Sequence, residues 1–173
     1  SWLDDKKFHT QWNNVNTMPL AFDSLSYEKL KDERYSVLDV CYIGGWANNG
    51  FDEKRKIMKE TFSAFNESGL KCAFFINKNV NHEQETKLMY NSKVAINIHD
   101  AYQRALRLDT NERTFKALGL NCILVSDHVS QINRLFPETK MSSSPKQMVE
   151  IVGDYCSMHP DDRNQIKEKN KQL

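Results

Sequence analysis

The chain has 173 residues, of which 39% are hydrophobic and 27% are charged, and its formal net charge is +1 at pH 7. These proportions are typical of a globular protein, and they exclude wholesale disorder and fibrous repeats. The apolar runs are only a few residues long, so none predicts a helix that crosses a membrane. A charge this close to zero also gives no bulk attraction to nucleic acid or anionic lipid.

Apolar runs typical of strands alternate with helical periodicity along the chain, which predicts an α/β fold. Residues 1–36 show no clear period and are interpreted as an irregular lead-in or interdomain segment. A predicted strand over residues 37–43 ends at two glycines, and a helix is predicted over 52–68. The next strand and helix are predicted over residues 71–76 and 82–91.

The same alternation continues through the second half of the chain. Predicted strands over residues 94–98 and 122–125 flank a polar loop and a short helix over 111–120. A helix of one or two turns near 129–135, a weak edge strand near 140–142 and a helix around 148–155 follow. A last helix is predicted to begin at Pro160, because proline and acidic residues favour a helix start. Residues 37–173 thus predict a Rossmann-like domain with three α/β/α layers and a mainly parallel sheet.

The cysteines give no sign of a metal site or a disulfide framework. None belongs to a Cys-x-x-Cys pair or has a histidine at zinc-finger spacing. They are Cys41, Cys72, Cys122 and Cys156. We expect buried free thiols in a reducing compartment, which favours a cytoplasmic protein. The sequence opens without a start methionine or a signal peptide, and we expect it to be a piece of a longer protein.

Glycines and polar residues follow the predicted strands. They are Gly44 and Gly45, then Asn77, then His99 and Asp100, then Ser126, Asp127 and His128. In open parallel sheets, ligands bind outside the carboxyl ends of the strands. The glycines leave room for a ligand, and the helix that begins near Asn111 directs free N–H groups to the same edge. This pattern favours a phosphate-bearing ligand.

Several named motifs are excluded by the residues present. Residues 45–50 have the glycine spacing of a Walker A loop, but the Lys-Ser/Thr pair that should follow is absent. No G-x-G-x-x-G occurs, which weighs against a dinucleotide oxidoreductase, and Asp100 alone cannot supply the paired acids of a phospho-receiver. His99 and His128 would need a third ligand to hold a metal, so no metal is expected. Arg55 follows a glycine turn closely enough to reach a diphosphate.

Five segments of the chain resemble CgeB-like, spore-maturation type, group 1 glycosyltransferases. Residues 90–99 resemble the family's Y-x-S-K-I-x-L-N-x-H, and residues 113–127 resemble its R-x-F-E-A-x-A-x-G-x-x-x-x-T-D. Residues 39–44 with Arg55 resemble the opening D-V-x-F-I-G…R, and residues 159–166 resemble the closing D-P-E-E-R-x-x-I. Residues 18–23 are similar to the L-P-x-x-x-D that enters the domain. The resemblance covers nearly the whole chain in register.

The resemblance implies the C-terminal, donor-binding domain of a GT-B glycosyltransferase, which takes a sugar from a nucleotide-diphosphate sugar to an unknown acceptor. It implies that no metal or other cofactor is needed. It also implies that an N-terminal acceptor domain, in cis or on a partner chain, is missing from this sequence. The resemblance and the positions of the strand ends together predict the residues that bind the donor and its phosphates. They are Gly44, Gly45, Arg55, His99, Asp109, Asn111, Glu112, Arg113 and Lys116.

The chain departs from the family at positions that bind the donor. The family glutamate that grips the ribose diol falls at Lys116, whose ammonium group accepts no hydrogen bond. Glu112, one helical turn earlier, can pair with Lys116 or supply the missing carboxylate. The family glycine before the next strand falls at Asn121. The first glutamate of the related E-x7-E pattern falls at Leu108, where only the neighbouring Asp109 can substitute.

Two other functions therefore stay open beside the glycosyltransferase donor domain. One is a degenerate GT-B half that binds or scaffolds a partner without turnover, and Lys116 is the feature that favours it. The other is an unrelated Rossmann-like module that binds a nucleotide.

Overall fold

Short apolar strands form a parallel sheet at the centre of the computed structural model, which describes residues 10, 12–14, 18, 20–45, 52–106 and 109–169. Within these residues the strand order is β2-β1-β3-β4-β5. The strands are β1 (Val40–Gly44), β2 (Cys72–Ile76), β3 (Val94–Asn97), β4 (Ile123–Ser126) and β5 (Lys140–Met141). Every neighbouring pair is parallel, so the predicted α/β fold with a mainly parallel sheet is confirmed.

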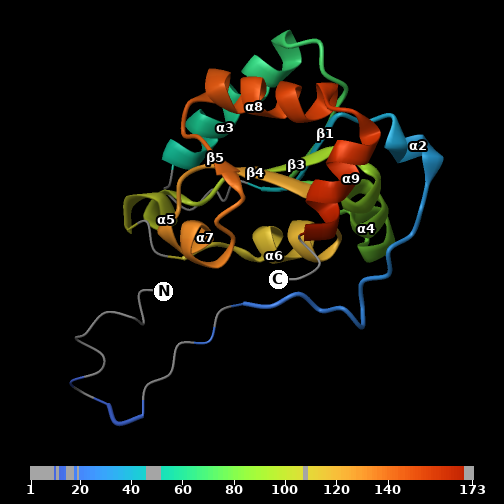
Figure 1. Cartoon of the computed structure of the whole chain (residues 1–173). Coiled ribbons are helices and arrows are strands. Elements are labelled where there is room, and N and C mark those ends of the chain that lie inside the picture. The colour runs from blue at the N-terminus through green and yellow to red at the C-terminus, as the bar shows by residue number, and fades with distance from the viewer. Residues whose placement is uncertain are drawn as a thin grey trace.

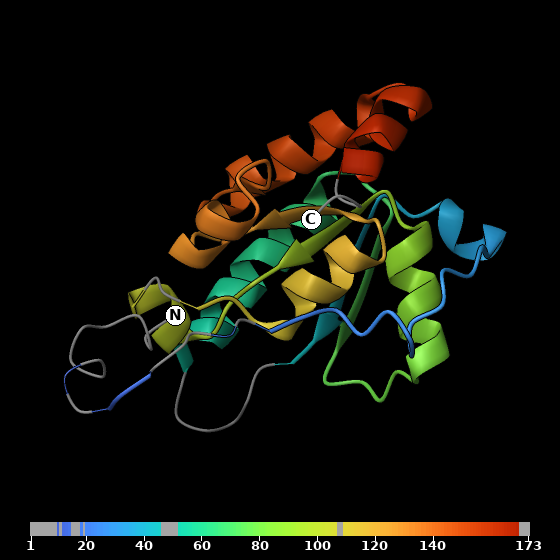
Figure 2. The same cartoon turned by 60° about the horizontal axis from the view of Figure 1, so that its bottom comes forward.

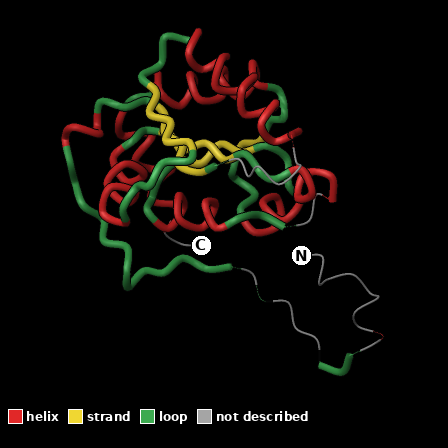
Figure 3. The backbone as a smooth tube through the Cα atoms, turned by 180° about the vertical axis from the view of Figure 1, so that it is seen from behind, coloured by secondary structure: helices red, strands yellow, loops and turns green. Residues whose placement is uncertain are grey.

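Helices cover both faces of this sheet, which gives the three predicted layers (Figures 1 and 3). The helices are α2 (Glu33–Ser36), α3 (Asp52–Glu67), α4 (His82–Asn91), α5 (Ala101–Leu106), α6 (Glu112–Gly119), α7 (Ser130–Leu135), α8 (Pro145–Ser157) and α9 (Pro160–Lys169). Helices α3 and α8 pack on one face, and α4 and α6 pack on the other.

Alternating side chains of the strands supply both halves of the core. Val40 and Tyr42 of β1 point toward α3 and α8, whereas Cys41 between them points toward α4 and α6. This is the period of two that a strand imposes on its side chains. Both faces are buried, which explains why the strands read as continuous apolar runs instead of alternating with polar residues.

Local signals in the sequence set where several helices begin and end. The side chain of Asn81 accepts a hydrogen bond from the backbone N–H of Gln84 and caps α4. Ser144 caps α8, with Pro145 in its first turn. Gly69 follows α3 with φ +76°, a left-handed conformation that favours glycine.

Residues 20–32 lie along the outside of α4 and α6 (Figure 2). The ring of Phe22 lies where a Cβ at position 119 would be, so Gly119 is required for this contact. Nearer α2, the side chain of Asn91 accepts from the N–H of Asp32 at 2.9 Å and donates to the carbonyl of Leu30 at 2.8 Å. The lead-in is therefore anchored to the domain.

The structure differs from the sequence prediction in two helices. Helix α2 lies within residues expected to be irregular, and its N-terminus is capped by Asp32, whose side chain accepts from the N–H of Arg34. Helix α5 lies within residues expected to be a polar loop. Both are short, with four and six residues, so neither has room for a recognisable hydrophobic period.

The described cysteines are free thiols. Burial raises the pKa of Cys72 and Cys156 to about 11, which keeps both protonated near neutral pH. Among the described residues, no helix combines the length and apolar character needed to cross a membrane.

Candidate functional site

The carboxyl ends of β1 and β3 lie side by side at the point where the chain changes direction across the sheet. From β1 the chain goes outward to β2, then returns to the other side of β1 and continues through β3, β4 and β5. This is the topological switch point at which ligands of open α/β sheets bind. Gly44 ends β1 and Asn97 ends β3, so these two residues mark the position of the site.

Arg113, in the first turn of α6, reaches across to both strand ends. Its Nε donates to the carbonyl oxygen of Ile43 at 2.5 Å, and its Nη1 donates to Oδ1 of Asn97 at 2.6 Å. The guanidinium also lies over the ring of Tyr42, 4.6 Å from the centroid. Two contacts with β1 and one with β3 therefore hold this cation in one orientation.

The two glycines after β1 provide the space that this arrangement needs. A Cβ at Gly44 would collide with the guanidinium of Arg113, and a Cβ at Gly45 would collide with the side chain of Asn77. Asn77 has a left-handed φ of 52°, and its N–H donates to the carbonyl of Gly44 at 2.9 Å. The sequence predicted that the glycines leave room for a ligand, whereas part of that room is taken by protein side chains.

The start of α6 is exposed to a cavity whose wall does not include Arg113. Asn111 occupies the N-cap position, but its side chain makes no capping hydrogen bond. Instead its amide forms a reciprocal pair with the amide of Asn97, with distances of 2.9 and 3.1 Å. Asp109, Asn111 and Glu112 line a cavity of about 370 Å³ together with Tyr102 of α5. The first-turn N–H groups of α6 thus have no side-chain cap, which suits an anion.

His99 lies below this surface in a buried hydrogen-bonded network. Its ring is 0% exposed, with Nδ1 facing Oδ1 of Asp127 at 2.5 Å and Nε2 facing Oγ1 of Thr110 at 2.8 Å. Thr110 in turn contacts Oγ1 of Thr114 at 2.6 Å. His99 therefore ties the end of β4 to the segment that precedes α6, and it supports the site without facing a ligand.

His128 does not join His99, although both follow strand ends. It is exposed and lines a separate cavity of about 610 Å³ with Arg104 and Ser130. The Nη1 atom of Arg104 lies 3.2 Å from Oδ2 of Asp127, yet it makes no well-aligned hydrogen bond there. Within the described part of the chain, no three His, Cys, Asp or Glu side chains gather where they could hold a metal ion.

Helix α3 presents Lys54, rather than Arg55, to the carboxyl edge of the sheet. Lys54 is 8% exposed, and its Nζ forms an ion pair with Oδ1 of Asp100 at 2.5 Å. Arg55 is exposed on the outer side of the same turn. Residues 46–51, which precede α3, lie outside the described residues.

Lys116 belongs to a cluster on the side of α6 that faces α4 and the lead-in. Its Nζ lies 2.8 Å from Oε1 of Glu112, 3.1 Å from Oε2 of Glu85 and 5.3 Å from the centroid of the Tyr27 ring. Burial alone would lower the pKa of Lys116, but hydrogen bonds to Glu112, Tyr27 and Glu85 outweigh it and raise the pKa. Lys116 does not line the cavity at Asn111. Glu112 lines that cavity and also pairs with Lys116.

Sequence reasoning missed the polar side chains that hold Arg113 and Asn111 in place. Asn97 and Thr114 are both 0% exposed and hydrogen-bonded to each other at 2.9 Å. Asn97 ends an apolar strand, and Thr114 lies on the buried face of a helix. A polar residue at such a position is a usable signal, because buried polar groups require partners.

The fold is that of a Rossmann-like α/β domain, consistent with a domain of a GT-B glycosyltransferase. Residues 32–173 match the family described as glycosyl transferase-like. That match covers more than half of the chain, and the chain therefore belongs to the glycosyl transferase-like family, which supports a role in glycosyl transfer. No curated protein matches the chain.

Proposed function

We propose that this chain is the donor-binding domain of a CgeB-like, two-domain GT-B glycosyltransferase and that Arg113 holds the diphosphate of a nucleotide sugar. One observation carries the proposal. Arg113 is half-buried, and both of its hydrogen bonds to described residues go to neutral acceptors. Its Nη2 lies beside Gly44 and makes no hydrogen bond to any of the described residues. A positioned cation without a counter-charge is a preorganised receptor for an anion.

The start of α6 adds a second source of positive potential at the same place. Arg113 lies in the first turn of this helix, so its guanidinium and the uncapped backbone N–H groups belong to one structural unit. Backbone N–H groups at a helix N-terminus bind phosphate oxygens, and the helix dipole favours a negative charge there. These groups would bind an inorganic anion equally well. Selectivity for a nucleotide therefore requires other residues that bind the nucleoside.

We assign ribose recognition to Glu112. Its side chain is 67% exposed, and it lines the cavity next to Asn111. The carboxylate of Glu112 can accept two hydrogen bonds from a ribose diol, which the ammonium group of Lys116 cannot do. The ion pair between them, at 2.8 Å, positions Glu112 for this role.

The second candidate function is a GT-B half that binds a partner without turnover. Lys116 favours it, because a residue held by Glu85 and Glu112 has a structural role in the interior of the α4–α6 face. In this case the chain no longer binds a nucleotide, and the role of Arg113 is to pack against Gly44.

A calorimetric titration tests the proposal against this alternative. Uridine, guanosine and adenosine, their diphosphates and the corresponding nucleotide sugars are titrated into the purified chain. We expect at least one nucleoside diphosphate to bind about tenfold or more tightly than its nucleoside, because a charge-assisted contact contributes about 1.5–3 kcal/mol. Equal affinity for nucleoside and diphosphate, or no binding of either, would favour the scaffold.

A further inference from the structure

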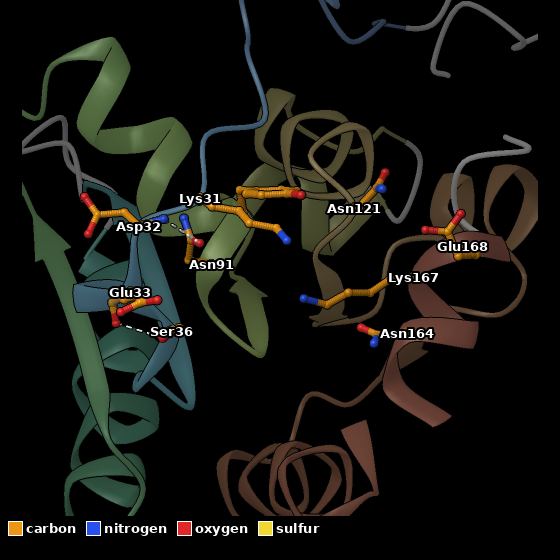
Figure 4. A pocket seen from close by; sticks show the side chains of 10 residues that line it. Lys31, Asp32, Glu33, Ser36, Asn91, Asn121, Asn164, Lys167 and Glu168 are labelled. Atoms are coloured by element: carbon orange, nitrogen blue, oxygen red, sulfur yellow. Dashed lines mark hydrogen bonds between the residues drawn. The ribbon is translucent and has the colours of Figure 1, made fainter. Parts of the chain in front are cut away.

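A second cavity, of about 310 Å³, lies at the opposite edge of the sheet, where the strands begin (Figure 4). Its wall comes from the lead-in with α2, the end of α4, the turn before β4, and α9. The lead-in contributes Lys31, the turn before β4 contributes Asn121, and α9 contributes Lys167. The volume lies at the lower end of the range for small-molecule sites. The cavity shares no residue with the site around Arg113, and so it is independent of the proposed function.

Two ammonium groups converge in this cavity. Figure 4 shows the side chains of Lys31 and Lys167 entering it from opposite walls, with their Nζ atoms toward each other. Neither lysine forms a hydrogen bond or an ion pair with any residue that the structure describes. Two cations that share one space repel each other, and an anion between them removes that repulsion.

The acidic residues of the cavity wall do not neutralise these lysines. The carboxylates of Asp32 and Glu168 point away from the two ammonium groups in Figure 4, and Glu33 forms no ion pair with a residue that the structure describes. Asp32 is bound by Arg34 through two hydrogen bonds, of 3.0 and 2.7 Å. The hydrogen bond from Arg34 lowers the pKa of Asp32 to about 2, so this carboxylate is ionised at neutral pH and remains paired with Arg34.

Asn121 adds a neutral hydrogen-bond donor to the same wall. The residue is only 8% exposed, and its Oδ1 accepts a hydrogen bond from Nζ of Lys29 at 3.0 Å. This contact fixes the orientation of the amide, and it leaves Nδ2 without a partner among the described residues. Asn121 also keeps a left-handed φ of 56°, which asparagine tolerates better than most residues. Nδ2 is not among the buried atoms that lack a partner, so it is accessible from the cavity and available to donate to a ligand there.

We propose that this cavity binds the phosphate group of a small phosphomonoester. A phosphomonoester is close to a dianion at neutral pH, which matches two lysines, and its oxygens accept from the free Nδ2 of Asn121. The cavity is larger than a phosphate group, and Tyr90 and Asn164 line the part that the organic group occupies. Because the ligand joins the lead-in, the turn before β4 and α9, its binding stabilises their packing.

Amide chemical-shift titrations of the whole chain test this site. Glycerol 1-phosphate and inorganic phosphate are the probes, and acetate at the same ionic strength is the control. We expect saturable shifts at Asn121, at its side-chain amide and at Lys167 with glycerol 1-phosphate, and none with acetate. Lys31→Gln and Lys167→Gln should each weaken this binding by roughly tenfold. Lys169→Gln removes the same charge from α9 outside the cavity and should change nothing.

A background of Arg113→Gln separates this cavity from the other site. Shifts at Asn121 that persist in Arg113→Gln and disappear in the double variant Lys31→Gln/Lys167→Gln support the proposal. Absence of saturable shifts, shifts that the double variant retains, or equal shifts with acetate would overturn it. Tighter binding of inorganic phosphate than of glycerol 1-phosphate would overturn the assignment to a phosphomonoester. Thermal unfolding of each variant confirms that it is folded.

Discussion

The guanidinium of Arg113 occupies the space that a side chain at Gly44 would need. The two residues lie far apart in the sequence, and their contact joins the start of α6 to the end of β1. A glycine here is therefore a requirement of packing as well as a means of admitting a ligand. Any larger residue must displace the group that we propose holds the diphosphate.

Gly44→Ala should accordingly weaken nucleoside diphosphate binding by roughly tenfold, because the guanidinium loses its fixed position. Overpacking at this contact should also cost about 1–3 kcal/mol of stability. Gly153→Ala is the matched control, since a Cβ there meets nothing within 4 Å and lies within α8. It should leave binding unchanged and add about 0.5–1 kcal/mol of stability. Calorimetry and denaturant unfolding measure both effects, and equal affinities of the two variants would contradict the role of the contact.

Lys116→Glu should lower the free energy of unfolding by about 2–4 kcal/mol, since it places a carboxylate beside Glu85 and Glu112. Lys116→Met removes the charge without that repulsion and should cost less. The exchange of charges in Glu85→Lys/Lys116→Glu should recover part of the loss. Urea unfolding of all three variants checks this order. If Lys116→Glu were as stable as the parent, the cluster would not hold α6 against α4.

The acid side of the stability profile should depend on Asp39. Burial alone would raise the pKa of Asp39, but hydrogen bonds from the N–H of Lys71 and from Lys93 outweigh it and lower the pKa. A lowered pKa adds stability above the unfolded value of about 3.9, and this stability is lost as pH falls through the folded value.

Asp39→Asn should therefore be less stable than the parent at pH 7, by about 1–2 kcal/mol. The difference between the two should shrink as the pH falls below about 4. Unfolding free energies measured from pH 7 to pH 2 give this comparison. A difference that stays constant over the whole range would show that the ionised carboxylate contributes nothing.

The purified chain should transfer no sugar on its own. In the proposed function the acceptor is held by a second domain, and the reaction is completed between the two domains. Incubation with nucleotide sugars and candidate acceptors, followed by mass spectrometry, should show no glycosylated product. Transfer to any acceptor by the 173-residue chain would mean that the chain carries the complete catalytic machinery.

Periodicity predicted the sheet and the longer helices because both faces of the sheet are apolar. It placed helix α4 at residues 82–91, which are its bounds in the structure. The apolar face of α3, extended by one turn from Met58 toward the start of the helix, would have identified Lys54 as the cation that faces inward. Lys54, Met58 and Phe65 lie on one buried stripe of α3, whereas Arg55 is rotated away from it.

Contacts between distant segments could not be predicted in the same way. Lys116 binds Glu85 and Tyr27, on α4 and the lead-in, and no local pattern links these residues. The Arg113 contacts with Asn97 and Ile43 likewise depend on which strands are neighbours. Strand order cannot be read from local sequence. The strand ends that Arg113 contacts were therefore identified only in the structure.

Titration of the parent chain and of Arg113→Gln with a nucleoside diphosphate tests the central claim most directly. Arg55→Gln, which removes the exposed cation of the neighbouring helix, is measured beside them. The account predicts that Arg113→Gln weakens binding by roughly tenfold to a hundredfold, the loss of a charge-assisted contact, while Arg55→Gln leaves it unchanged. Unchanged affinity in a folded Arg113→Gln variant would contradict the account, and a loss confined to Arg55→Gln would move the phosphate site to the start of α3.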